Sequence, residues 1–219
     1  MKTVIVIGAT GLIGKFIVNK MLTDNSYNSV KVFSRRSTGI NNQKLEEHIF
    51  NFDEISKWKS KIAGDELFSA MGTTIRKAGS KEAQYKIDVT YQYEFAKAAA
   101  ENGIMNYFLV SSSGANADSK LFYMRIKGEL EEKVKALPFD KIRIFRPSLL
   151  LGERNEKRFG EKVAEKLLKI VVPVFPFLKN QQPIEGEKVA EAMIAEANRE
   201  VGEKVKVLEV NEIFELARV

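Results

Sequence analysis

The sequence contains no cysteine, which excludes disulfides, thiolate nucleophiles and zinc centres built from cysteine across its 219 residues. It also has a single histidine, His48, and no pattern of metal-binding or catalytic partners surrounds it. We interpret His48 as a strand surface residue rather than a base or a ligand. We therefore expect no metal site.

Long hydrophobic runs and targeting patterns are also lacking. No apolar run approaches the ~20 residues needed to span a bilayer. Met1 leads directly into an expected strand, without a charged leader and a cleavage site. The formal net charge is +6, but lysine and glutamate are interleaved along most expected helices, which is typical of a solvated surface. We expect a cytoplasmic protein with no membrane span and no nucleic-acid partner.

The most informative stretch of the sequence is its first fourteen residues. The β-branched run Val4–Ile7 is typical of a strand buried on both faces, as in parallel sheets. It leads into Gly8, Gly11 and Gly14, and a helical pattern follows at once. Glycines between a strand and a helix let the backbone approach a pyrophosphate, and the helix N-terminus favours its charge. This turn predicts a dinucleotide-binding fold.

Strand and helix patterns then alternate along the chain. We expect further strands at 30–33, 45–52, 66–71, 107–110, 141–145 and 205–210. This alternation predicts an α/β protein: a Rossmann-type doubly wound parallel sheet flanked by helices. We expect one NAD(P)-binding domain over 1–219, with about 150–200 forming a small C-terminal, substrate-side cap. Within it the apolar stretch 170–178 could line a substrate pocket, cover a dimer partner, lie on a membrane surface or simply pack in the core.

The end of the second expected strand indicates the cofactor. An acidic residue at this position binds the ribose 2′-OH of NAD, whereas arginine accommodates the 2′-phosphate of NADP. The sequence offers Ser34, Arg35 and Arg36 and no acid nearby, and a guanidinium can bind a phosphate with two hydrogen bonds. We therefore favour NADP(H) over NAD(H). Asp53, after the third expected strand, could cap the helix that follows or contact an adenine amino group.

A second informative pattern lies in the expected helix after the fifth strand. Tyr123 and Lys127 are four residues apart, so they share one helix face. Free tyrosine has a pKa near 10 and exchanges protons poorly at neutral pH, but a neighbouring ammonium favours the phenolate. A hydroxyl from the serine run 111–113 could hold a substrate oxygen beside them. The pattern predicts a site for proton transfer.

Together these features resemble the short-chain dehydrogenase/reductase superfamily, in its atypical, NAD(P)-binding epimerase-like branch. The stretches 69–74, 111–115, 123–131 and 145–147 are most similar to the Tat-interacting-protein-like oxidoreductases. The resemblance implies hydride transfer to or from a small carbonyl or alcohol of unknown identity. It implies that Tyr123 is the general acid/base, that Lys127 lowers its pKa and holds the nicotinamide ribose, and that Ser112 orients the substrate. Ser113 is the alternative serine.

The resemblance also implies a set of cofactor contacts near the carboxyl ends of the strands. They are Gly8, Thr10, Gly11, Leu12, Ile13, Ser34, Arg35, Arg36, Asp53, Met71, Gly72, Thr73, Tyr123, Lys127, Pro147 and Leu149. Many relatives carry an asparagine that helps a proton relay on the helix before the fifth strand, whereas 87–90 here reads Ile-Asp-Val-Thr. The part after Gly152 is short, which favours a reductase over a sugar-nucleotide epimerase.

A non-catalytic alternative stays open. The chain could hold NADP(H) as a redox sensor and change its affinity for a protein partner without turnover. The complete set of Ser112, Tyr123 and Lys127 favours the enzyme, because a sensor needs none of the three. A homodimer is also left open.

Overall fold

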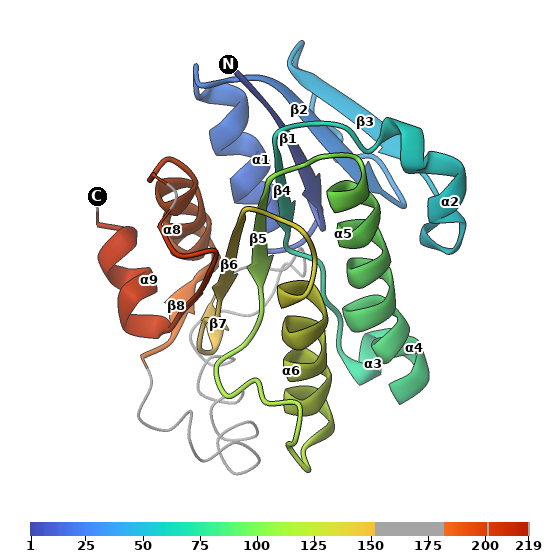
Figure 1. Ribbon diagram of the computed structural model, residues 1–219, viewed down its shortest axis with the longest axis vertical. Coiled ribbons are helices and arrows are strands. Elements are labelled where there is room, and N and C mark those ends of the chain that lie inside the picture. Colours follow the sequence, from blue (N-terminus) through green and yellow to red (C-terminus); the bar gives the residue numbers. More distant parts are fainter. Residues whose placement is uncertain (152–181, 201, 219) are drawn as a thin grey trace.

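A seven-stranded parallel sheet forms the centre of the protein. The computed structural model describes residues 1–151, 182–200 and 202–218 (Figure 1). The strands are β1 (Lys2–Ile7), β2 (Tyr27–Ser34), β3 (Leu45–Ile49), β4 (Glu66–Ser69), β5 (Asn106–Val110), β6 (Lys141–Phe145) and β9 (Val205–Leu208), and their order is β3-β2-β1-β4-β5-β6-β9. From β1 the chain builds the sheet outwards to β2 and β3, and from β4 onwards it builds the sheet in the opposite direction. The strand order therefore switches between β1 and β4, and doubly wound sheets bind their ligands at such a point.

Helices cover both faces of this sheet (Figure 1). On one face lie α1 (Gly14–Thr23), α8 (Gly186–Ala197) and α9 (Val210–Leu216), and on the other lie α5 (Tyr91–Glu101) and α6 (Phe122–Lys135). The short helices are α2 (Ile55–Trp58), α3 (Ile75–Ala78) and α4 (Lys81–Tyr85), and a separate two-stranded ladder pairs β7 (Leu150–Leu151) with β8 (Ile184–Glu185). The predicted doubly wound α/β fold is confirmed. Among the helices that the structure describes, none is long and apolar enough to cross a membrane.

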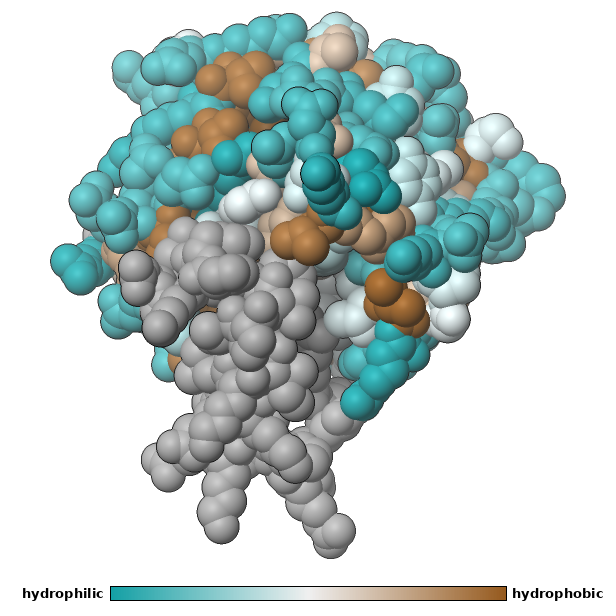
Figure 2. All heavy atoms as spheres, turned by 90° about the horizontal axis from the view of Figure 1, so that it is seen from below, coloured by the Kyte–Doolittle hydropathy of each residue, from teal (hydrophilic) through white to brown (hydrophobic). Residues whose placement is uncertain are grey.

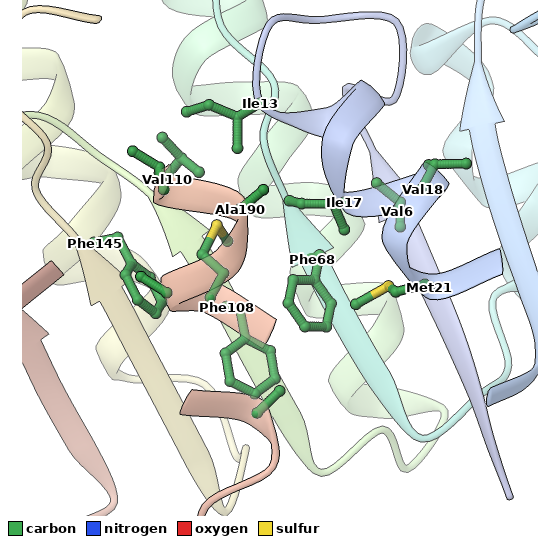
Figure 3. Close-up of a cluster of buried hydrophobic side chains, with 14 of the residues drawn as sticks. Val6, Ile13, Ile17, Val18, Met21, Phe68, Phe108, Val110, Phe145 and Ala190 are labelled. Carbon is green, nitrogen blue, oxygen red and sulfur yellow. The ribbon is translucent and has the colours of Figure 1, made fainter. Parts of the chain in front are cut away.

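Each face of the sheet has its own hydrophobic core, because successive side chains of a strand point to opposite faces. Val4 and Val6 of β1 pack in the core shared with α1, α8 and α9, part of which is drawn in Figure 3. Ile5 and Ile7 pack in the core shared with α5 and α6. All four side chains are completely buried, which is why β1 is a continuous apolar run.

A π-helical turn interrupts the helical segment before β5. Ser80 caps α4, where its Oγ accepts a hydrogen bond from the Ala83 N–H at 3.1 Å. A π turn (Lys86–Thr90) then joins α4 to α5. π turns are frequent at functional sites, and this one contains the completely buried Asp88. Nothing in the hydrophobic periodicity indicates it.

Two predictions around β3 are wrong. The strand ends at Ile49 instead of continuing to residue 52, and a short 3₁₀ helix (Phe52–Glu54) follows. The helix that follows, α2 (Ile55–Trp58), has Glu54 at its N-cap and no capping side chain, so Asp53 does not cap it; Asn51 caps the 3₁₀ helix by accepting a hydrogen bond from the Asp53 N–H at 3.1 Å. The Asp53 carboxylate instead lies 2.6 Å from Lys86 Nζ and 2.9 Å from the Tyr91 hydroxyl.

His48 is also not the surface residue that we expected. Only 8 % of it is exposed, and its ring centroid lies 4.5 Å from that of Phe33. The Trp58 ring packs against the His48 ring in an edge-to-face arrangement, with 6.1 Å between the ring centroids. Burial, the larger influence, lowers the pKa of His48 and outweighs the opposing attraction of Glu46. It is an aromatic member of the core face of β3.

The range 150–200, expected to form a substrate-side cap, contains a core helix. α8 packs against α1 and α9, and Val189, Ala190 and Met193 are completely buried in the core on that side of the sheet. The C-terminal part of the range 150–200 therefore belongs to the layer of helices formed by α1, α8 and α9. The apolar stretch 170–178 and the rest of 152–181 lie outside the described residues.

Candidate functional site

The glycine turn after β1 is packed so tightly that side chains would not fit. Gly8 has a φ of +81°, and a Cβ added there would lie 2.5 Å from the Ala70 carbonyl carbon. A Cβ on Gly14 would lie 2.2 Å from the Gly8 carbonyl oxygen, so α1 begins directly against the turn. Within the described residues, the N–H groups of Leu12 and Ile13 donate to no protein acceptor. Free donors at a helix N-terminus fit the pyrophosphate of a dinucleotide.

The arginine pair lies at the neighbouring end of β2. Ser34 is buried, and its hydroxyl donates to the Arg36 carbonyl oxygen. Arg35 and Arg36 are exposed, and neither forms an ion pair with an acidic residue in the part of the chain that the structure describes. Two guanidinium groups are therefore available beside the glycine turn.

A buried carboxylate holds the loop that follows β4. Asp88 Oδ1 accepts a hydrogen bond from the Thr73 N–H at 3.0 Å, and Oδ2 accepts one from Gln84 Nε2 at 3.0 Å. Gly72 lies so close that an added Cβ would be 3.2 Å from Asp88 Oδ1 and 3.7 Å from Lys127 Nζ. The loop, the π turn and α6 therefore meet at Asp88.

Lys127 is the cation that faces this carboxylate. Only 4 % of Lys127 is exposed, and its Nζ lies 3.6 Å from Asp88 Oδ1 and 5.8 Å from the centroid of the Tyr123 ring. Burial by itself would lower the pKa of Lys127, but the charges of Asp88, Tyr123 and Glu131 outweigh it and raise that pKa above its ordinary value. Lys127 is thus a charged ammonium beside the half-buried Tyr123 at neutral pH. A fixed positive charge next to a phenol is suited to proton exchange.

The serine run continues the sheet beyond β5. The Ser111 N–H donates to the Phe145 carbonyl oxygen at 2.7 Å, and the Ser113 N–H donates to the Pro147 carbonyl oxygen at 2.9 Å. The run and the segment after β6 are therefore joined by main-chain hydrogen bonds. This brings two predicted parts of the site together, the serines and Pro147.

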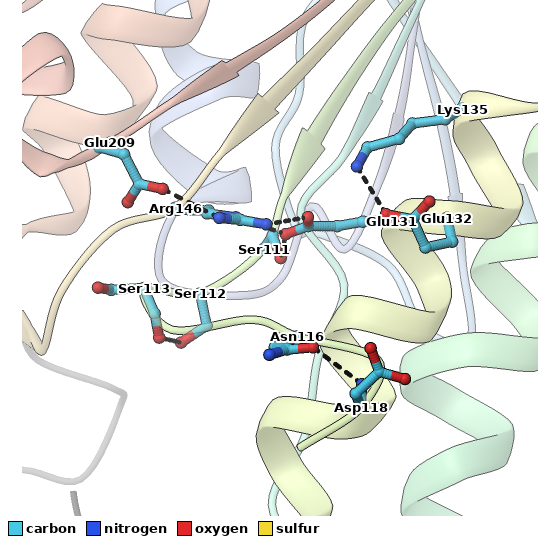
Figure 4. Close-up of polar contacts among 10 residues, drawn as sticks. All are labelled: Ser111, Ser112, Ser113, Asn116, Asp118, Glu131, Glu132, Lys135, Arg146 and Glu209. Atoms are coloured by element: carbon cyan, nitrogen blue, oxygen red, sulfur yellow. Dashed lines mark hydrogen bonds and ion pairs between the residues drawn. The ribbon is translucent and has the colours of Figure 1, made fainter. Parts of the chain in front are cut away.

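The three serine hydroxyls differ in their surroundings. Ser111 donates to the buried Glu131, which Arg146 also contacts through Nη2 at 2.6 Å and Nε at 3.0 Å (Figure 4). The side chain of Ser112 is half-buried, and its only contact within the described residues is a long one of 3.4 Å to the Ser113 carbonyl oxygen. Ser113 is 1 % exposed. Ser111 thus has a structural partner, whereas Ser112 and Ser113 remain the candidates.

The Glu131–Arg146 ion pair lies beside the candidate serines, and sequence reasoning did not single it out. Arg146 also reaches Glu209 at 3.0 Å, at the N-cap of α9 (Figure 4). Glu131 follows Lys127 by one helical turn, so its spacing was a signal, but its partner Arg146 comes directly after β6, in a separate element. Seen from below in Figure 2, the surface of the described residues is mostly hydrophilic, with separate hydrophobic patches.

Comparison with known proteins decides the family. The sequence pattern of the NAD dependent epimerase/dehydratase family matches residues 4–209, nearly the whole chain. This chain belongs to that family. Its fold and its glycine turn agree with a dinucleotide-binding member of the family.

Individual members of the family are similar over most of their length. Protein fmp52-1, mitochondrial, of Aspergillus terreus is 35 % identical over 231 residues, and the match covers 100 % of both chains. Protein HTATIP2 of Rattus norvegicus is 32 % identical over 169 residues, covering 75 % of this chain and 69 % of that protein. The resemblance to Tat-interacting-protein-like oxidoreductases is confirmed. A solved structure, a putative NAD-dependent epimerase/dehydratase from Bacillus halodurans, has a TM-score of 0.71 at 17 % identity and covers 100 % of this chain and 99 % of that chain.

The expected cytoplasmic location is wrong. Relatives that are 35–41 % identical, among them that of Candida albicans, are named as mitochondrial proteins. The expectation depended on the lack of a recognisable secretory leader at Met1, and that pattern does not test for import into an organelle.

Proposed function

We propose that this chain is an NADP(H)-dependent oxidoreductase that transfers hydride to or from a small carbonyl or alcohol substrate. The observation that carries the proposal is the buried, charged Lys127 beside Tyr123 and the Gly72 loop, at the carboxyl edge of a dinucleotide-binding sheet. A bound nicotinamide would supply or accept the hydride.

In this proposal the chain's own groups handle the proton. Tyr123 exchanges it with the substrate oxygen, and the positive charge of Lys127 favours the phenolate that remains. Ser112 donates a hydrogen bond that orients the substrate oxygen, with Ser113 as the alternative. Lys127 also binds the nicotinamide ribose, while Pro147 and Leu149 flank the nicotinamide.

The remaining cofactor contacts follow the same edge of the sheet. Gly8, Thr10, Gly11, Leu12 and Ile13 hold the pyrophosphate, since the turn offers free N–H groups and little bulk. Ser34, Arg35 and Arg36 bind the 2′-phosphate, Asp53 contacts the adenine side, and Met71, Gly72 and Thr73 line the cofactor after β4. The arginines are exposed and form no ion pair within the described residues, which supports NADP(H) over NAD(H).

Tyr123→Phe tests the chemistry. NADPH binding should survive, and turnover should fall by at least about a hundredfold, because a positioned general acid/base contributes roughly 10²–10⁴-fold. Tyr93→Phe, in the neighbouring helix α5, is the matched control and should keep full activity. An unchanged rate for Tyr123→Phe removes this residue from the mechanism. Tight NADPH binding without turnover of any carbonyl in a broad panel would favour the redox-sensor function.

Arg35→Ala tests the cofactor preference. Wild-type protein should bind NADPH more tightly than NADH in a fluorescence titration, and the variant should lose about tenfold or more of that ratio, because charge-assisted hydrogen bonds to the phosphate are removed. Equal affinity of the wild type for the two cofactors would contradict the proposal.

The names of the relatives also support a mitochondrial location, which we include in the proposal. Protection of the full-length protein from added protease in intact mitochondria would test it. Full digestion together with cytosolic marker proteins would contradict it.

A further inference from the structure

A single carboxylate fixes the loop that carries the arginine pair. Glu47, in the middle of β3, accepts a hydrogen bond from Ser37 Oγ at 2.6 Å and one from the Thr38 N–H at 2.7 Å. It also accepts one from the Thr38 hydroxyl. Both oxygens of Glu47 are therefore engaged by the two residues that follow Arg36.

The two hydroxyls continue this network into the loop. Having donated to Glu47, Ser37 Oγ accepts a hydrogen bond from the Gly39 N–H at 3.0 Å, and Thr38 Oγ accepts one from the Ile40 N–H at 3.2 Å. One carboxylate thus sets the orientation of four successive residues of the chain. Burial of Glu47 opposes its ionisation, but the hydrogen bonds from Ser37 and Thr38 outweigh it and lower its pKa, so it is charged at neutral pH.

The other side of the arginine pair is fixed as well. The Ser34 hydroxyl donates to the Arg36 carbonyl oxygen, and the Phe50 N–H donates to the Ser34 carbonyl oxygen at 3.0 Å. Arg35 and Arg36 are thus exposed side chains on a backbone that is held immediately before and immediately after them. The three donors to the Glu47 oxygens come from Ser37 and Thr38, and none of them is a guanidinium group.

We propose that Glu47 is a positioning residue for cofactor discrimination, which holds the 35–40 loop so that Arg35 and Arg36 face the 2′-phosphate of NADP(H). This inference rests on the proposed function, in which those arginines bind that phosphate. A loop fixed before binding loses less conformational freedom when it binds, so its affinity for the phosphate is higher. The role is specific to the phosphate, because NADH has a neutral 2′-hydroxyl in its place and gains no charge-assisted hydrogen bonds from the arginines.

The sign of the effect separates this role from simple electrostatics. Removing a negative charge near a phosphate site should by itself strengthen the binding of NADPH, because like charges repel. Loss of the loop's anchor should weaken it. Glu47→Gln retains the size of the side chain and an amide oxygen that can accept from Thr38, but its amide nitrogen then faces the Ser37 hydroxyl, so the hydrogen bond from Ser37 to a charged acceptor is lost. Glu46→Gln is the matched control, because it removes the same charge from the adjacent strand position, where the carboxylate contacts His48 instead of the loop.

The experiment measures dissociation constants of NADPH, NADH, 2′,5′-ADP and 5′-AMP for wild type, Glu47→Gln, Thr38→Val and Glu46→Gln. Glu47→Gln and Thr38→Val should weaken NADPH and 2′,5′-ADP by about 5- to 20-fold and change NADH and 5′-AMP by less than about twofold. Glu46→Gln should leave NADPH unchanged or slightly tighter. Thr38→Val keeps Glu47 and its charge, so it decides the matter alone if Glu47→Gln fails to fold.

Arg35→Ala separates failure of this inference from failure of the proposed function. If Arg35→Ala leaves the NADPH preference intact, or the wild type has none, the cofactor assignment is wrong. If Arg35→Ala removes the preference while Glu47→Gln and Thr38→Val bind NADPH as wild type does or more tightly, the role of Glu47 is wrong. Equal weakening of NADPH and NADH in both loop variants also overturns it, because the loss is then general.

Discussion

Asp88 joins the cofactor-side loop to the helix that carries Tyr123 and Lys127. Its carboxylate lies 3.0 Å from the Thr73 nitrogen and 3.6 Å from Lys127 Nζ, and none of it is exposed. Many members of the resembled superfamily carry a neutral asparagine in this region. Here the carboxylate balances the charge of the buried lysine directly, so the ammonium has a fixed counter-ion before any ligand binds.

Asp88→Asn should therefore destabilise the protein. The variant keeps the side chain's size and an acceptor for Thr73, but it leaves Lys127 without its nearest counter-ion. We expect the pKa of Lys127 to fall and the free energy of unfolding at pH 7 to decrease by about 3 kcal/mol, as when one partner of a buried ion pair is removed. Urea unfolding measures the change. Asp140→Asn, at an exposed residue with no ion pair within the described residues, is the control; equal stability of the two variants would contradict a role for the pair.

Among the elements, the approach of α6 to the serine loop sets the geometry of the site. A Cβ on Gly128 would lie 2.1 Å from the Ala117 nitrogen and 2.3 Å from the Asn116 carbonyl carbon. The Asn116 N–H also donates to the Met124 carbonyl oxygen at 3.1 Å, so the loop is hydrogen-bonded along the helix. Gly128 directly follows Lys127, and its missing side chain lets the loop lie beside the site.

Gly128→Ala should consequently be destabilising, although alanine favours a helix by about 1 kcal/mol over glycine. Both close contacts are with backbone atoms, so the loop has to move, and overpacking of this kind costs about 1–3 kcal/mol. We expect a lower midpoint of urea unfolding. We also expect lower activity at temperatures where the variant is still folded, because the displaced loop carries Ser112 and Ser113. Gly202→Ala, where nothing lies within 4 Å of an added Cβ, should change neither quantity. A stabilised Gly128→Ala variant would show that the loop is not held in place by this contact.

For the whole molecule, the predicted site crosses the carboxyl ends of several strands, so a bound cofactor would connect segments far apart in sequence. Any ligand that binds only the folded state stabilises it by mass action. At about 100 times its dissociation constant, NADPH should add about 2.7 kcal/mol, which raises the Tm of a protein of this size by about 5–10 °C.

Thermal unfolding with equal concentrations of NADPH and NADH measures this shift. NADPH should give the larger increase in Tm, and the difference should disappear in Arg35→Ala. If neither cofactor raises the Tm, the glycine turn is not a dinucleotide site in this chain.

The sequence by itself determined the layers of the fold. Parallel strands buried on both faces require continuous apolar runs, and amphipathic helices require a 3.6-residue period, so both are visible locally, as at Val4–Ile7 and in α1. The glycine turn and the Tyr123–Lys127 spacing are equally local. The end of β3 was less predictable, because Phe50 and Phe52 continue an apolar pattern although the strand ends at Ile49 and a 3₁₀ helix begins at Phe52.

Only the tertiary structure decided which groups face one another. Asp88 meets Lys127 because a π turn rotates it towards the loop after β4, and helical periodicity does not encode such a turn. Ser111 is bound to Glu131, and Glu47 to Ser37 and Thr38, through contacts between separate elements. The energy of a buried charge depends on the groups packed around it in three dimensions. Residue type and spacing therefore indicated where chemistry was expected, and packing determined the partners of each charged group.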